Sequence, residues 1–409
     1  MVKLKLKQNC RKGVEYLDII HEKKIGKNAY FKEILAYLCV FFLISKYYID
    51  IILKGLHSPM PKMFLLGALA CAVILLGIKV LSKQVYKIEV FIGSIFIIQF
   101  LITGNTLFLI AYIFSMALGQ VEFRKIMKCY FLVSLSYFLS MIILGDKGLI
   151  IIGYMGVRSD LGFKNPNTAF ISFFMVWSSF LYLYLKSKEC KSSEQKLAYS
   201  ELKLDLFKDL GIVILCIFPL IVYSETKTRT GLLTVILIFM FIIMIKFLEK
   251  KNISLRFLEY IPQLFTLVSL GLALLFGNNW ITNKFLSDRP KYWDMYLTHW
   301  KYGLNLQGYD NNIRDIVFSE RIPLDSGYVF GLYVGGLIIF IIFIKMLSLS
   351  IRQLIKEEKI AEIVFMVSIL IYSFAETILL DINTNPALIL VFYYAFKNWE
   401  EMKKLNNIK

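Results

Sequence analysis

The sequence predicts an all-α fold, a polytopic integral membrane protein with about twelve transmembrane helices and one large external loop. Three observations lead to this fold class. Of the 409 residues, 57% are hydrophobic and only 19% are charged, and the mean hydropathy is +0.62. Many apolar runs approach or reach the roughly 17–25 residues that cross a bilayer. Along the chain, every second polar segment between these runs is basic, as expected for the cytoplasmic loops of a membrane protein.

The predicted spans are apolar runs separated by polar turns or basic segments. They cover residues 34–53, 63–80, 88–103, 105–119, 128–145, 168–185, 209–223, 230–247, 259–277, 327–345, 361–380 and 384–397. The pair within 88–119 is divided only by the turn sequence "TGNT", and the run 384–397 is short for a span. Residues 1–33 are basic and no cleavage-site pattern follows them, so the first run is expected to be a retained span.

The distribution of positive charge predicts the orientation in the cytoplasmic membrane. With the N-terminus inside and alternating spans, about 32 Lys and Arg lie on the inside and about 13 on the outside. Both termini are then cytoplasmic. The chain divides into a basic N-terminal segment (1–33), a transmembrane domain (34–397) that includes the external loop 278–326, and a cytoplasmic tail (398–409).

Several classes of function are disfavoured by what the sequence lacks. The net charge of +17 is explained by topology, and no nucleic-acid-binding motif accompanies it, so no nucleic acid is expected as a partner. The six Cys lie in spans or on predicted inside segments, which predicts free thiols rather than disulfides or a metal site. No GxSxG, HExxH or P-loop pattern is present. The sequence therefore predicts neither a metal nor a cofactor.

The polar sequence clusters fall on the outside of the predicted topology. They are "RSDLGFKNPNTAF" (158–170), "SETKTRTG" (224–231), "DRPKYWDMYLTHWKYG" (288–303), "RIPLDSGY" (321–328) and "DINTNP" (381–386). The inside loops are generic basic stretches by comparison. Because the fifty-residue loop 278–326 is too long for a simple connection, it is expected to be functional. The candidate site is therefore external.

Four external arginines suggest an anion-binding site. They are Arg158, Arg229, Arg289 and Arg321. Positive charge on the outside opposes the topological bias, and guanidinium groups bind phosphate in bidentate geometry. The alternative is that each arginine pairs with a nearby carboxylate: Arg158 with Asp160, Arg229 with Glu225, and Arg321 with Asp325.

The stretch "GFKNPN" combines a helix start with further polar groups. Pro166 ends extended structure, and Asn167 is expected to cap a helix from Thr168 onward. A helix cap at Asn167 explains only that asparagine and gives no structural reason for Lys164 and Asn165 beside it. Asn165 is therefore a candidate for binding the hydroxyl groups of a polar substrate.

The external loop is predicted to contain an amphipathic helix that begins at an Asp288 cap, with Pro290 in its first turn. At 100° per residue, one face carries Arg289, Tyr292, Trp293, Tyr296 and Trp300, and the other carries Lys291, Asp294, Thr298 and Lys301. Two interpretations stay open. The helix is either an anchor at the membrane interface or a lid over a substrate groove.

Acid–base groups are few on the outside. The acids there include Asp160, Glu225, Asp288, Asp294, Asp310 and Asp325, and His299 is the one well-placed histidine. Asp325 has a competing structural interpretation as the cap of the tenth span.

At this point four motifs resemble bacterial polysaccharide repeat-unit polymerases (Wzy-type) and the related O-antigen ligases. "RSDLGFKNPN" resembles their Arg followed by G-F-x-N-P-N, and "TRTG" resembles their S-R-T/S-G turn. "DRPKYW" resembles R-x-x-x-W at the start of the large external loop, and "LDSGY" with "GLYVGGLI" resembles D-N/S-x-Y followed by G-G. The order is kept over roughly residues 150–345, whereas the N-terminal third is similar only in hydropathy.

The resemblance implies a metal-independent glycosyltransferase of GT-C-like type. Such enzymes join undecaprenyl-diphosphate-linked oligosaccharides into capsular, exo- or O-antigen polysaccharide at the outer face of the cytoplasmic membrane. They contact membrane lipid, and chain-length regulators and flippases are their candidate partners.

The resemblance also implies roles for particular residues. The diphosphate and substrate would be held by Arg158, Lys164, Asn165, Asn167, Arg229, Arg321, Tyr292 and Trp293. Catalytic roles would fall to Arg289 for the leaving charge and to Asp325, or second to His299, for the acceptor hydroxyl.

Two rival functions stay open at this stage. Ligases carry His-Asn where this chain has Asp325-Ser326, which favours a polymerase. A lipid-linked oligosaccharide flippase or another transporter would place ionisable residues near the membrane midplane. Here the deepest ones are Lys46 and Glu376, and neither is central in its predicted span. The long external loop also favours an enzyme.

Overall fold

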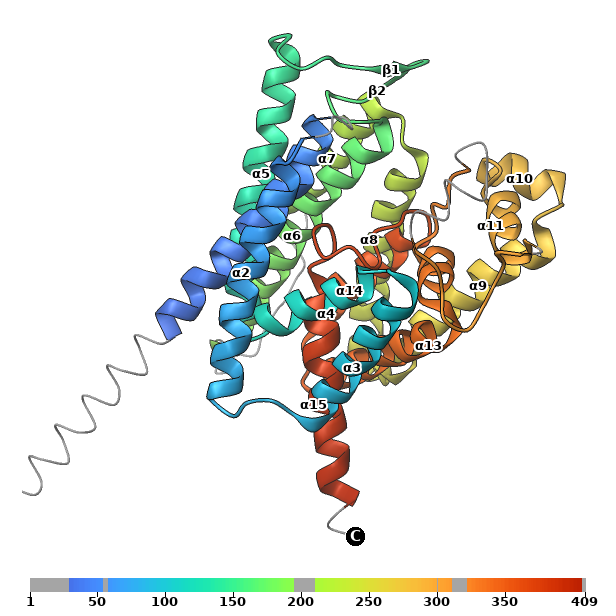
Figure 1. Cartoon of the computed structure of the whole chain (residues 1–409). Helices are drawn as coiled ribbons and strands as arrows, with labels where there is room; N and C mark the ends of the chain where they lie inside the picture. The colour runs from blue at the N-terminus through green and yellow to red at the C-terminus, as the bar shows by residue number, and fades with distance from the viewer. Residues whose placement is uncertain (1–28, 54–57, 195–209, 300, 311–321, 407–409) are drawn as a thin grey trace, which may run out of the picture.

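The computed structural model describes residues 29–53, 58–194, 210–299, 301–310 and 322–406, and it is mostly helical (Figure 1). After the helix Ala29–Ile52 come α2 (Met60–Leu81), α3 (Lys87–Thr103), α4 (Leu107–Leu118), α5 (Phe123–Asp146), α6 (Pro166–Glu194), α7 (Leu210–Thr226), α8 (Arg229–Lys250), the 3₁₀ helix η1 (Leu255–Tyr260), α9 (Ile261–Phe276), α10 (Trp280–Leu286), α11 (Arg289–Thr298), α13 (Gly327–Lys356), α14 (Ile360–Ser373) and α15 (Ala387–Asn406). Strands β1 (Tyr154–Met155) and β2 (Arg158–Ser159) form a short antiparallel hairpin.

Seven of the described helical segments are long and apolar enough to cross a membrane. They are Ala29–Ile52, Met60–Leu81, Phe123–Asp146, Pro166–Glu189, Arg229–Lys250, Leu255–Phe276 and Gly327–Lys356. Each of the other predicted runs also contains a helix. However, α4 has 12 residues and α14 has 14, which at 1.5 Å per residue is shorter than the roughly 30 Å hydrocarbon core. The all-α membrane fold is therefore as predicted at this coarser level.

The exposed apolar surface and the buried core are clearly separated. Large apolar side chains on α2 and α8, such as Leu66, Val73 and Ile243, are more than 60% exposed, as expected for side chains that meet lipid. In contrast, every residue of α14 from Ala361 to Ser373 is buried. This helix packs against α6, α8, α9, α13 and α15, so other helices of the protein surround it.

The predicted span 361–380 is helical only as far as Ser373. The chain then continues as a buried, irregular segment to α15. Its polar groups replace the helix hydrogen bonds: Asn385 Nδ2 donates to Leu379 O at 2.7 Å, and Asp381 accepts from the backbone N–H of Asn383 at 3.1 Å. The sequence "DINTNP" is thus a structured turn, and Glu376 before it is buried just beyond the end of α14, where its N–H donates to Tyr372 O at 3.1 Å.

Helix α13 is broken at Gly336, where φ is 68° and ψ is 173°. The freed backbone groups have partners. Leu337 N donates to Asn305 O at 3.0 Å, and Gln99 Nε2 donates to Val334 O at 3.1 Å. Asn305 belongs to the predicted external loop, and the described part of this loop around Asn305 therefore packs into the break. An interrupted helix at membrane depth is tolerated where protein surrounds it in this way.

Most of the polar sequence motifs gather at one end of this bundle. The starts of α6, α8, α11 and α13 and the end of α14 meet there, close to the β1–β2 hairpin. In Figure 1 the hairpin lies at the upper end of the molecule, and the end of α15 lies at the lower end.

We predict that Gly336→Ala lowers the thermal stability of the purified protein. An L residue at this positive φ is strained by roughly 1–3 kcal/mol, and the added Cβ would clash with the backbone of Gly308. The measurement is the unfolding midpoint in detergent. Gly77→Ala in α2 is the matched control, because nothing lies within 4 Å of its added Cβ. Equal midpoints for the two variants would contradict the packing of the loop into the break.

Candidate functional site

Arg289 lies between two carboxylates at the centre of the polar end. Its Nε is 3.5 Å from Asp325 Oδ2, and its Nη2 is 3.6 Å from Glu376 Oε1. The three groups come from the start of α11, the segment before α13 and the segment after α14. The Arg289 side chain is 13% exposed and that of Glu376 is 7% exposed, whereas that of Asp325 is 32% exposed. The arrangement is a largely buried ion triplet that opens to the surface at Asp325.

Arg158 is fixed by hydrogen bonds from three segments. Its Nη2 donates to Asn167 Oδ1 at 2.7 Å and to Thr228 Oγ1 at 3.4 Å, and its Nε donates to Thr226 O at 3.1 Å. Burial lowers the pKa of the Arg158 guanidinium from its ordinary value, and Glu376 opposes that shift. The group stays cationic because arginine is charged throughout the physiological range.

Two of the other predicted arginines lie within electrostatic range of Arg158. Arg289 and Arg229 both disfavour the charge on Arg158, and Glu376 favours it. Arg229 is exposed at the first turn of α8. Arg321 lies outside the described residues. The structure therefore brings together Arg158, Arg229 and Arg289, a concentration of positive charge that two buried or half-buried carboxylates only partly neutralise.

The turn "TRTG" is positioned by close helix packing. Thr228 Oγ1 donates to Pro166 O at 3.3 Å, which joins the start of α8 to the start of α6. A side chain at Gly231 would clash with the ring of Phe170, so glycine lets α8 approach α6. This contact holds Arg229 beside Arg158.

The helix cap in "KNPN" is the other asparagine from the one predicted. Helix α6 begins at Pro166, two residues before the predicted start, and Asn165 Oδ1 accepts from Thr168 N at 2.8 Å. Asn165 is therefore the cap, and the prediction that Asn167 caps the helix is wrong. Asn167 instead orients Arg158. Lys164 beside them is exposed.

Asp160 shapes the hairpin loop. Its side chain is buried, and Oδ1 accepts from the backbone N–H of Gly153 at 2.8 Å and of Gly162 at 2.9 Å. These bonds hold the two sides of the hairpin together. Asp160 thus helps to position Arg158 at β2 through the backbone.

Helix α11 has the two faces that the sequence predicts. Trp293 and Tyr296 are buried, whereas Lys291 and Thr298 are exposed. Trp293 packs edge-on against Phe374, and Tyr296 Oη donates to Ile322 O at 2.7 Å. Because protein covers Trp293 and Tyr296, these two side chains are not membrane anchors; Trp300 of the same predicted face lies outside the described residues.

Of the remaining α11 residues, Tyr292 is half-buried, and Asp288 occupies the N-cap position without a side-chain cap hydrogen bond. Trp293 is 1% exposed, so its ring is not open to a sugar in this conformation. His299 follows the helix, and its Nδ1 accepts from Lys301 N at 3.3 Å and from Tyr302 N at 3.1 Å. The imidazole therefore organises the turn after α11.

Glu376 is the site residue that sequence reasoning missed. Its electrostatic partners are Arg289, Asp325 and Arg158. The available signal was an acidic side chain within an otherwise apolar run, which by itself suggests a functional position in a membrane protein. Its distance to Arg289 is longer than a hydrogen bond, so Oε1 keeps its hydrogen-bonding capacity.

Further buried polar atoms without a hydrogen-bond partner occur around Glu376 in the described part of the chain. They are Tyr372 Oη, Ser373 Oγ, Asn383 Oδ1 and Asn385 Oδ1. Buried polar groups are nearly always paired, and exceptions commonly mark functional positions. The end of α14 and the segment after it can therefore offer hydrogen bonds to a polar ligand that reaches Glu376.

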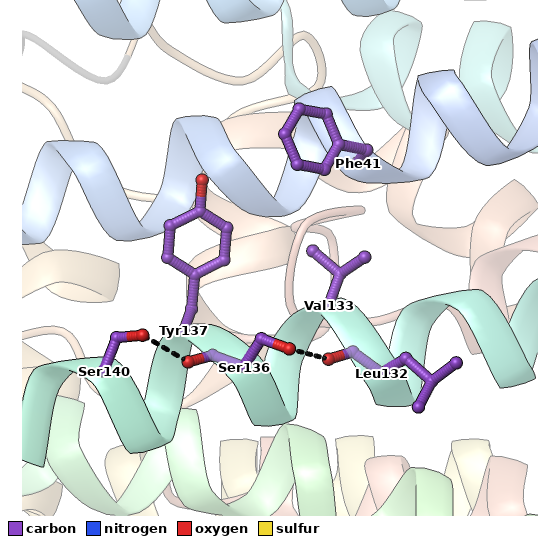
Figure 2. Close-up of a pocket in the computed structure, with 6 residues that line it drawn as sticks. All are labelled: Phe41, Leu132, Val133, Ser136, Tyr137 and Ser140. Atoms are coloured by element: carbon purple, nitrogen blue, oxygen red, sulfur yellow. Dashed lines mark hydrogen bonds between the residues drawn. The ribbon is translucent and has the colours of Figure 1, made fainter.

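A separate groove of about 360 Å³ lies between the helix Ala29–Ile52 and α5 (Figure 2). Its lining residues are Phe41, Leu132, Val133, Ser136, Tyr137 and Ser140. Ser136 Oγ and Ser140 Oγ each donate to the carbonyl four residues earlier at 2.8 Å, so the groove offers mainly apolar surface. None of the arginines lines it, and it is distinct from the charged site.

No cluster of three or more His, Cys, Asp or Glu side chains with the geometry of a metal site occurs among the residues that the structure describes. No family model, curated protein or solved structure matches the chain significantly. The site is therefore interpreted from its own geometry and chemistry.

We predict that Asn165→Ala lowers the unfolding midpoint, because loss of a helix cap costs about 0.5–2 kcal/mol. Asn165→Asp should restore most of the stability, since aspartate caps as well as asparagine. Thermal unfolding in detergent measures both. Asn167→Ala should loosen the orientation of the Arg158 side chain and lower the unfolding midpoint less than Asn165→Ala does. If Asn167→Ala is the more destabilising of the two alanine variants, the assignment of the cap to Asn165 is wrong.

We also predict that Glu376→Ala destabilises the fold, because it removes one of the two carboxyl groups that face the largely buried Arg289. Arg289 would keep only the more exposed Asp325 as a partner. Glu225→Ala is the control, since Glu225 is an exposed carboxylate at the same end of the bundle. A midpoint for Glu376→Ala equal to that of the control would contradict the buried triplet.

Proposed function

We propose that the protein joins undecaprenyl-diphosphate-linked oligosaccharide repeat units into a surface polysaccharide at the outer face of the cytoplasmic membrane. The observation that carries this proposal is the convergence of Arg158, Arg229 and Arg289 with two carboxylates at one end of an apolar helical bundle. Guanidinium groups suit a diphosphate, and the surrounding apolar helices suit its polyprenyl chain.

The proposed topology has about twelve membrane crossings and both termini in the cytoplasm. It is supported by a helix within each predicted apolar run and by the bias of Lys and Arg toward the inside loops. Under this topology the arginine-rich end faces outward. Shorter helices such as α4 and α14 would complete their crossings with buried, non-helical backbone.

The donor would bind through its diphosphate. Arg158 is held by fixed hydrogen bonds and is preorganised for this purpose, and the exposed Arg229 is free to close on the phosphates. Preorganised cations stabilise charge that develops on a leaving group. Arg289 lies deeper and would meet the leaving diphosphate while Asp325 and Glu376 hold its orientation.

The proposed reaction is a substitution at the anomeric carbon. A hydroxyl oxygen of the acceptor repeat forms the new glycosidic bond, the bond to the diphosphate oxygen breaks, and the diphosphate leaves with the electron pair. A carboxylate takes the hydroxyl proton. Asp325 suits this role, because its side chain is 32% exposed and lies 3.5 Å from Arg289. The more deeply buried Glu376 suits a positioning role.

An O-antigen ligase would perform the same substitution with a different acceptor. The motif Asp325-Ser326 favours the polymerase, with Ser326 Oγ accepting from Val329 N at 3.4 Å as the cap of α13. A flippase or another transporter would need a polar path at the membrane midplane. The concentration of charge at one end of the bundle favours a reaction site at the surface instead.

We predict that Arg158→Ala and Arg289→Ala each abolish long polymer while the protein remains inserted in the membrane. Loss of the guanidinium removes stabilisation of the leaving diphosphate. Gel analysis of surface glycan in a deletion strain complemented with each variant measures chain length, and immunoblotting of membranes measures insertion.

Arg256→Ala is the matched control, because this exposed arginine lies near η1 on the predicted inside. It should support normal polymer. Normal polymer lengths in both site variants would exclude the proposed binding of the diphosphate by Arg158 and Arg289. In the deletion strain, lipid-linked single repeats without a ladder support polymerisation, whereas loss of single repeats from the outer face would indicate a flippase.

A further inference from the structure

Helix α10 carries an apolar face that no described part of the chain covers. Trp280 is 70% exposed, Ile281 is 62% exposed and Phe285 is 85% exposed. With Lys284 they occupy one side of the helix, within an arc of about 140°. Asn283 points to the other side and is buried. The exposed face is therefore a consistent surface of the helix rather than a set of isolated side chains.

This surface continues that of the preceding transmembrane helix. Leu274, Leu275 and Phe276 at the end of α9 are 54%, 77% and 43% exposed. The segment Leu255–Phe276 is one of the seven that are long and apolar enough to cross a membrane. The apolar face of α10 thus begins where the lipid-facing side of α9 ends.

The composition of α10 suits the boundary between lipid headgroups and acyl chains. Tryptophan is enriched at that depth, and a lysine beside it can reach the headgroup phosphates. The Nζ atom of Lys284 lies 5.9 Å from the centre of the Trp280 ring. A second protein would suit an apolar patch of this size equally, but it would not explain the continuity with α9.

The buried side of α10 connects the membrane helix to the arginine site. Asn283 Nδ2 donates to Gly277 O at the end of α9 at 2.6 Å, and Asn283 Oδ1 accepts from Lys291 N in α11 at 3.1 Å. The carbonyl of Asn283 also accepts from Asp288 N at 2.8 Å. One side chain of α10 therefore joins α9 to the first turn of α11.

The link between α10 and Arg289 is short and conformationally restricted. Ser287 and Asp288 both adopt left-handed backbone, with φ of 56° and 60°. Non-glycine residues in this region are strained and persist where the surroundings hold them. The packing of Asp294 against Gly277, where an added Cβ would be 2.6 Å from Asp294 Cβ, fixes α11 on the same corner.

We propose that α10 is an interfacial helix that inserts Trp280, Ile281 and Phe285 into the outer-leaflet boundary of the bilayer and thereby sets the position of Arg289. The contact with lipid stands on the exposure, the composition and the continuity with α9. The consequence for Arg289 rests on the proposed function, because a lipid-linked diphosphate lies at the depth of the headgroups.

Fluorescence quenching by brominated phospholipid tests the lipid contact. Full-length protein with Trp280 as its single tryptophan, the others being replaced by Phe, is reconstituted into vesicles with bromine near the headgroup end of the acyl chains. We expect Trp280 to lose most of its emission there and to resist quenching by aqueous iodide. Quenching by iodide but not by the brominated lipid would overturn the proposal, and so would resistance to both, which would indicate a protein partner.

A protein with Trp293 as the single tryptophan is the control, since Trp293 is buried within the protein and should resist both quenchers. Because replacing buried tryptophans can disturb folding, the wild-type protein gives an independent measurement. Photoreactive phospholipid should label the peptide that contains Trp280 and Phe285. Labelling confined to the transmembrane helices would overturn the proposal.

The double variant Trp280→Asp, Phe285→Asp separates this inference from the proposed function. We expect it to lose lipid labelling at α10 and to make less polymer than wild type. Arg158→Ala, whose contacts lie on α6, α7 and the start of α8, should lose polymer but keep the labelling. Labelling of α10 in a wild-type protein that makes no polymer would leave the interfacial helix standing and refute the polymerase. Full polymer in the double variant after loss of labelling would refute the coupling to Arg289.

Discussion

The ion triplet of Arg289, Asp325 and Glu376 is the interaction on which the arrangement of this end of the molecule depends. Its members come from three segments that are far apart in the sequence, and two of the three side chains are nearly buried. Burying the Arg289 guanidinium without a carboxyl partner would be destabilising, so the triplet favours the observed positions of these three segments. The start of α11, the entry to α13 and the exit from α14 are constrained by this requirement.

Close approaches between helix backbones also fix the relative positions of these segments. Gly231 lets α8 reach α6, and the break at Gly336 lets the external loop reach α13. These contacts place Arg229 beside Arg158 and hold the loop that carries Arg289. The described part of the site is thus supported by packed helices, which is the arrangement that the proposed binding of a diphosphate needs.

The predicted external loop contains two amphipathic helices, α10 and α11, and both carry aromatic side chains that end in different surroundings. The aromatic side chains of α11 turn into the protein, while those of α10 remain exposed beside the end of α9. The sequence drew attention to α11 because its faces separate clearly at helical spacing. Helix α10 has seven residues, and its apolar face becomes apparent only when Asn283 is seen to be buried on the other side.

The sequence by itself determined the membrane class, the places of the helices and the two faces of α11, because hydropathy and helical periodicity are local properties. The tertiary structure decided which polar groups meet. Asn165 and Asn167 have the same chemistry, and the start of α6 at Pro166 decides which one caps and which one orients Arg158. Glu376 joined the site because α14 ends early and is enclosed by other helices, which depends on packing between segments far apart in the chain.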